Sequence, residues 1–131
     1  MFARLHLFKS SMRTFATSPK HMSSSEATKI IQELKENETE ENVNLVNEYF
    51  RANFRKLDFD SAVTLLKHSH DVECLEDQFW VWEAIEEALR PEIMNCSYDK
   101  VQEIMGYYGK YAHQSTYLFH DLQQRFFKHE S

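Results

Sequence analysis

The sequence has few of the residues that interrupt regular structure: two glycines, two prolines and two cysteines among 131 residues. Because glycine and proline mark turns, their scarcity argues against a protein of many short strands. The two cysteines stand alone, without a CxxC pair, which excludes a zinc ribbon and a disulfide framework. Nucleotide-binding, serine-hydrolase and zinc-protease motifs are also missing. The sequence therefore predicts a non-catalytic protein without a cofactor or a small-molecule substrate.

Acidic residues are absent from the first 20 residues, which contain the cations Arg4, Lys9, Arg13 and Lys20 among serines and apolar residues. A basic, serine-rich, amphipathic segment is typical of a mitochondrial presequence. The stretch Arg13 to Ala16 resembles a matrix-peptidase site, and Phe15 to Met22 resembles the octapeptide that a second peptidase removes. We therefore predict a presequence over residues 1–22 and a single domain over 23–131. The predicted location is the mitochondrial matrix or the matrix side of the inner membrane.

Long apolar runs are missing as well. No segment approaches the roughly 18 apolar residues of a membrane span, so we expect contact with a membrane to be peripheral at most. The formal charge is −6, and it becomes −10 without the first 20 residues, or −9 if cleavage follows Phe15. Since affinity for nucleic acid depends largely on Lys and Arg, we do not expect a nucleic-acid partner.

The apolar residues instead recur at helical spacing along the chain. The expected helices cover residues 24–36, a segment after 37–39, a segment from 58 or 60, residues 75–89, a segment from 95–97, and residues 114–128. Ser23 and Glu26 predict a capping box for the first helix, and Pro91 is expected to end the fourth. The predicted fold class is all-α, with about six helices in three degenerate antiparallel hairpins, stacked as a short solenoid or bundle.

The helix pairs resemble one another. The segment Leu57–Leu66 aligns with Cys96–Met105 at an offset of 39, and Trp80–Leu89 aligns with Tyr117–Phe126 at an offset of 37. A period in the upper thirties with two helices per period indicates a helical-hairpin solenoid. The apolar pattern from Phe59 to Leu66, followed by an aromatic-rich second helix, resembles the degenerate repeats of organellar tetratricopeptide-like, octotricopeptide and FAST-kinase-like proteins. That resemblance implies RNA binding along long arrays, or a scaffold role.

Both glycines lie in Gly106-Tyr107-Tyr108-Gly109, a GxxG spacing that KH modules use to clamp a nucleic-acid backbone. A KH site also needs flanking strands and small or basic residues between the glycines, and neither is present. Gly109 is better interpreted as the left-handed residue that ends a helix. Gly106 lies within that helix, at a cost of about 1 kcal/mol relative to Ala, so we expect a close helix neighbour or a kink there.

One segment concentrates possible metal ligands: His68, His70, Asp71 and Cys74. These are side chains that zinc or iron would use. The segment coincides with a predicted turn between helices, where polar residues belong in any case. We therefore predict no metal site, and keep an enzyme or metal protein built on these four residues as an alternative.

The aromatic residues give the candidate partner-binding positions. A helical wheel of the fourth helix places Phe79 and Trp82 on the core arc and Trp80 off it. In the sixth helix Tyr117 and Phe127 fall outside the apolar stripe, and the predicted solenoid ends in Phe126-Phe127, where a free solenoid would have a polar capping helix. The predicted partner-binding residues are Trp80, Tyr117, Phe126 and Phe127.

These observations predict an accessory or structural subunit of a large mitochondrial assembly. A respiratory-chain complex or the ATP synthase fits an acidic subunit better than the mitochondrial ribosome does. The expected partners are other protein subunits of that complex. The alternatives are a module that binds mitochondrial RNA or associates with the mitoribosome, and an assembly factor.

Overall fold

The computed structural model describes residues 21–108 and 116–130, and over these residues the chain is helical, with turns and no strands. The helices are α2 (Ser24–Glu36), α3 (Glu40–Ala52), α4 (Phe59–Ser69), α5 (Phe79–Ile93), α6 (Tyr98–Tyr108) and α7 (Thr116–Glu130), with a 3-10 turn, η2 (Glu73–Leu75), before α5. The predicted all-α class with six helices is therefore confirmed.

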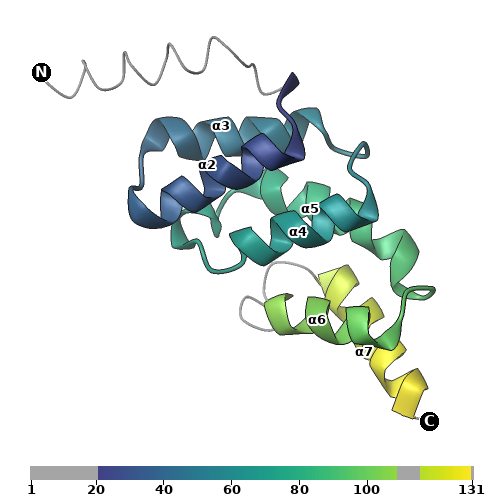
Figure 1. Ribbon diagram of the computed structural model, residues 1–131. Helices are drawn as coiled ribbons and strands as arrows, with labels where there is room; N and C mark the ends of the chain where they lie inside the picture. Colours follow the sequence, from purple (N-terminus) through teal and green to yellow (C-terminus); the bar gives the residue numbers. More distant parts are fainter. Residues whose placement is uncertain (1–20, 109–115, 131) are drawn as a thin grey trace, which may run out of the picture.

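The six helices form three hairpins, α2–α3, α4–α5 and α6–α7, which stack one after another from the upper left to the lower right of Figure 1. Each helix packs against its hairpin partner and against the corresponding helix of the next hairpin. The first helices, α2, α4 and α6, therefore form one layer, and the second helices, α3, α5 and α7, form the other. This arrangement is the stacked-hairpin fold that the repeat pattern predicts.

Side-chain caps explain where α2, α3 and α4 begin. The Ser23 hydroxyl accepts a hydrogen bond from the Glu26 N–H, and the Glu26 carboxylate accepts one from the Ser23 N–H, which completes the predicted capping box. The Thr39 hydroxyl accepts one hydrogen bond from the Asn42 N–H at the start of α3, and the Asp58 carboxylate accepts one from the Ser61 N–H at the start of α4. Each cap satisfies an N–H group that the first helical turn leaves without a partner.

The predicted limits of the fourth helix, residues 75–89, are wrong at both ends. Residues 73–75 form a 3-10 turn instead, and the carbonyl of Leu75 accepts a 2.9 Å hydrogen bond from the buried Trp82 indole N–H. At the other end α5 continues through Pro91 to Ile93. Proline in the last turn removes one helical hydrogen bond, and the four residues added after Leu89 place the fully buried Ile93 in the core.

The core runs through all three hairpins along the line between the two layers. Its largest fully buried side chains come from every helix described, among them Ile31, Phe50, Leu65, Leu89, Ile104 and Leu118. Met22, within the predicted presequence, also belongs to this core and exposes only 6% of its surface. Within the described residues, no helix combines the length and the apolar character that crossing a bilayer requires.

Candidate protein-binding surface

Side-chain contacts cross the layer formed by α3, α5 and α7 in two groups, one from Phe79 to Glu87 and one around Arg90, three residues after Glu87 on α5. We call the two groups together the strip; its members are Phe54, Arg55, Phe79, Trp80, Glu87, Arg90, Tyr117 and Asp121. It contains two of the three large hydrophobic side chains that are most exposed among the described residues, Phe79 at 61% and Tyr117 at 69%. These two mark its ends, on α5 and α7.

Three aromatic rings form one end of the strip. The Phe79 and Trp80 rings meet edge to face, with centroids 5.0 Å apart. Trp80 in turn meets Phe54, from the end of the preceding hairpin, at 5.6 Å. Such edge-to-face pairs stabilise by about 0.5–1.5 kcal/mol beyond area burial. The cluster therefore holds the exposed Phe79 ring on a fixed support.

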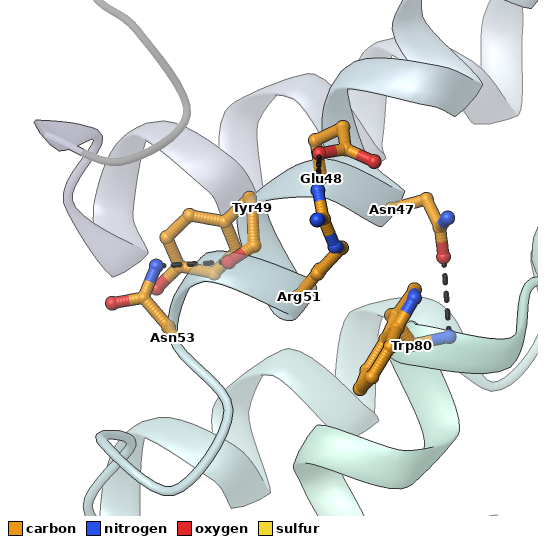
Figure 2. A network of polar contacts seen from close by, with 6 residues as sticks. All are labelled: Asn47, Glu48, Tyr49, Arg51, Asn53 and Trp80. Carbon is orange, nitrogen blue, oxygen red and sulfur yellow. Dashed lines mark hydrogen bonds and ion pairs between the residues drawn. The ribbon is translucent and has the colours of Figure 1, made fainter.

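The backbone of Trp80 is held by a side chain from another helix. Gln78 precedes α5 but makes no side-chain capping bond. Instead the Asn47 amide oxygen, on α3, accepts a 3.2 Å hydrogen bond from the Trp80 N–H (Figure 2). Asn47 therefore acts as a cap across 33 residues and fixes the beginning of α5 against α3.

Trp80 is half-buried and packs against the core, in contact with a residue of the neighbouring hairpin. The predicted position of Trp80, off the core arc of the helix, is compatible with contact to a neighbouring hairpin. Phe79, in contrast, was expected in the core and is exposed. The reason is the late start of α5: Phe79 is its first residue, with no earlier helical turn to pack beneath it.

Arg55 joins the aromatic end to the middle of the strip. Its guanidinium lies 5.2 Å from the centroid of the Phe54 ring, and its Nε lies 3.5 Å from the Glu87 carboxylate on α5. Both charged groups are largely exposed, so the ion pair adds little stability. Arg55 also has a φ of +68°, a left-handed conformation that is uncommon for a residue with a side chain. The turn after α3 thus directs this arginine toward α5.

The other end of the strip joins α5 to α7. Arg90 donates a 3.0 Å hydrogen bond from Nε to Asp121, and its guanidinium lies 5.3 Å from the centroid of the Tyr117 ring. The hydrogen bond to Asp121 raises the pKa of Arg90, and the charges of Asp121, Glu86 and Glu87 act in the same direction. Arg90 therefore remains a cation and orients the exposed tyrosine ring.

Two hollows flank this part of α5. The larger, about 480 Å³, lies between the turn after α3 and α5, and the smaller, about 330 Å³, lies between α5 and α7. Glu87 and Pro91 line both, so the hollows meet along α5. We call these two adjoining hollows, which strip residues help to line, the groove.

The four candidate metal ligands do not converge. Asp71 forms a 3.1 Å ion pair with Lys35, and the His70 ring lies against Tyr107, with centroids 4.9 Å apart. Burial lowers the pKa of His68, and burial raises the pKa of the Cys74 thiol, assisted by Glu38. Within residues 21–108 and 116–130 no three His, Cys, Asp or Glu side chains are placed to hold a metal ion.

The predicted partner-binding residues have different outcomes. Trp80 and Tyr117 belong to the strip, whereas the side chains of Phe126 and Phe127 lie outside the described part of the chain. The predicted cap residue Gly109 also lies outside it. Sequence reasoning missed Phe79, Arg55 and Arg90. Their roles depend on a tertiary turn and on pairs separated by 31 or more residues, for which the sequence carries no local signal.

Comparison of the chain with known protein families, with curated proteins and with solved structures found no match.

Proposed function

We propose that this protein is a non-catalytic accessory subunit of a large mitochondrial assembly and that it docks through the strip. A respiratory-chain complex or the ATP synthase is the assembly that fits best. The observation that carries the proposal is the pair of exposed aromatic side chains, Phe79 and Tyr117, held in place on one layer of the helical stack.

The support for these rings distinguishes the strip from a scatter of exposed apolar residues. Phe79 rests on Trp80, and Tyr117 is covered on one face by Arg90. Aromatic and arginine side chains that are already ordered lose little conformational entropy on binding, and they are enriched at the energetic centres of protein interfaces. The proposal therefore assigns the strip to protein recognition.

The charge favours a protein partner over RNA. Residues 21–131 keep 11 of the 15 Lys and Arg residues and all 21 acidic residues, a formal charge of −10. Arg55 and Arg90, the two arginines of the strip, are already paired with carboxylates. Free cations that could neutralise phosphates are what RNA binding would require.

The mitochondrial location rests on the basic first 20 residues. The test is complexome profiling of gently solubilised mitochondria: the peptides of this protein are followed through a native gel, with an RNase-treated sample in parallel. We expect comigration with a respiratory complex or the ATP synthase, unchanged by RNase. Migration as a small free species would overturn the proposal. A shift after RNase treatment would favour a module bound to mitochondrial RNA or to the mitoribosome.

The same experiment with variants connects the function to the strip. Phe79→Ser with Tyr117→Ser removes both exposed rings without touching the core, and we expect the protein to leave the assembly. Met94, the third exposed large hydrophobic residue, lies outside the strip, so Met94→Ser is the matched control and should remain bound.

A further inference from the structure

We propose that the groove beside the strip binds a basic, amphipathic helix of the partner protein. This inference rests on the proposed function, because it gives the chemistry of the partner at the same surface. It depends on three properties of the groove: the adjacency of its two hollows, the apolar residues in its lining and the sign of its charge.

The two hollows of the groove adjoin along the second half of α5, where Glu87 and Pro91 line both. The larger hollow reaches from the residues before α4 to α5, and the smaller reaches from α5 to α7. Helices from all three hairpins, or the turns beside them, thus line the two adjoining hollows. A partner in it would contact the whole stack and not a single helix.

Apolar residues make up part of the lining of the groove. Leu57, Phe59 and Ala88 line the larger hollow, and each is half-buried and packed against the core. Pro91 adds an exposed apolar surface where the two hollows meet. Burial of such a surface favours a ligand with apolar side chains along one side, as amphipathic helices have at spacings of three and four residues.

The rim of the groove is acidic. Four carboxylates line the hollows, those of Asp58, Glu87, Glu92 and Asp121, against the two guanidinium groups of Arg55 and Arg90. Both arginines are already engaged, with Glu87 and with Asp121. The remaining negative charge adds to that of a domain with a formal charge of −10. A ligand that places Lys or Arg beside its apolar face complements this rim.

The direct test is a fluorescence-polarisation titration of the full chain with labelled 20-residue designed peptides. One peptide has leucines and lysines on opposite faces of a helix, the second has glutamate in place of lysine, and the third has the first composition in a shuffled order. We expect saturable binding of the first peptide alone, weakened by salt because the charges are exposed. Equal binding of the shuffled or the acidic peptide would overturn the inference.

Variants distinguish the groove from the general attraction of an acidic protein. Glu87→Lys with Glu92→Lys reverses two charges of the rim, and we expect the affinity to fall at least about tenfold. Glu36→Lys with Glu40→Lys makes the same change of net charge at exposed positions on α2 and α3 and should leave the affinity within about twofold. An equal loss in both double variants would contradict a specific groove. Circular dichroism verifies that each variant is folded.

The chain's own basic segment is the rival occupant. Arg4→Glu with Lys9→Glu and Arg13→Glu in the full chain removes its cationic character. Unchanged peptide binding supports a partner helix, whereas a gain of about tenfold would assign the groove to the first 20 residues and overturn the inference.

Comigration with an assembly but no peptide selectivity would contradict this inference alone. Selective peptide binding by a protein that migrates free would contradict only the accessory-subunit proposal.

Discussion

At the level of a single residue, Asn47 supplies the side-chain cap that the sequence before α5 lacks. Helix N-termini leave several N–H groups without partners, and a side-chain oxygen close by in the sequence usually accepts from one of them. In α5 that oxygen comes from α3, so one hydrogen bond both caps a helix and fixes two hairpins together. The position of Trp80, and of the strip that begins beside it, depends on this contact.

We expect Asn47→Ala to lower the free energy of unfolding by about 1 kcal/mol, because the Trp80 N–H loses its acceptor. Asn47→Asp keeps an oxygen at this position and adds a negative charge near a helix N-terminus, so it should be neutral or slightly stabilising. Urea denaturation monitored by tryptophan fluorescence measures both. A similar loss in the two variants would show that packing of Asn47, and not its role as an acceptor, is what stabilises α5.

Gly106 is a second single residue whose effect on stability can be predicted. The expected close helix neighbour is absent: a Cβ added at Gly106 would meet no atom of the described residues within 4 Å. Since nothing nearby requires the glycine, we expect Gly106→Ala to stabilise α6 by about 1 kcal/mol. Thermal unfolding should show a rise in the midpoint of roughly 4 °C or more. Gln102→Ala, at an exposed position of the same helix, is the control and should change stability by less than about 0.5 kcal/mol.

At the scale of helices, local sequence signals predicted what depends on local physics. The predicted capping box at Ser23 forms, and α3 and α4 begin after Thr39 and Asp58, within the predicted starts. The limits of α5 were not predictable in this way. The 3-10 turn at residues 73–75 is fixed by the buried hydrogen bond from Trp82 to Leu75, and the continuation past Pro91 by the burial of Ile93. Both are tertiary effects that a periodic pattern does not contain.

The candidate surface also has features that the sequence predicts and features that it does not. The wheel of α7 placed Tyr117 outside the apolar stripe, and Tyr117 is exposed. The partners that hold the rings are remote in sequence: Asn47 for Trp80, and Asp121 for the arginine that covers Tyr117. The sequence therefore predicts the exposure of Tyr117, but it misplaces Phe79 and does not show how the stack arranges these side chains into one strip.

The core also extends beyond the N-terminal end of α2. Met22 directly precedes the capping residue Ser23, exposes 6% of its surface and belongs to the core, as a hydrophobic residue at this position often does. We expect Met22→Ser to lower the free energy of unfolding by about 1.5–3 kcal/mol, measured by urea denaturation. Met94→Ser, at a position 45% exposed, should cost far less. Equal effects of the two substitutions would contradict the structural role of Met22. A mature chain beginning at Ser23 would lack this residue.

At the scale of the whole molecule, stability should be greatest between about pH 6.5 and 8.5. Burial lowers the pKa of His68, with Lys35 and Lys67 acting in the same direction, so the unfolded chain takes up a proton first as the pH falls below about 6.5. The contribution of His68 is therefore lost on acidification. Burial raises the pKa of the Cys74 and Cys96 thiols, so their contribution is lost as the pH rises through the range in which unfolded thiols ionise.

Urea midpoints from pH 5 to 9 test this profile. His68→Gln should flatten the acidic side of the curve, because the proton uptake that distinguishes the unfolded from the folded state is removed. If the slope between pH 5 and 7 were the same in the His68 variant as in the original chain, another group would be responsible for it.

The central claim concerns the whole stack: one layer, formed by α3, α5 and α7, binds a protein partner, and the layer of α2, α4 and α6 does not. Photo-crosslinking in intact mitochondria tests it most directly, with p-benzoylphenylalanine in place of Phe79, Tyr117 or, on the other layer, the exposed Gln32. The account predicts crosslinks to the same protein from positions 79 and 117 and none from position 32. Crosslinks from position 32 alone, or from none of the three positions, would contradict it.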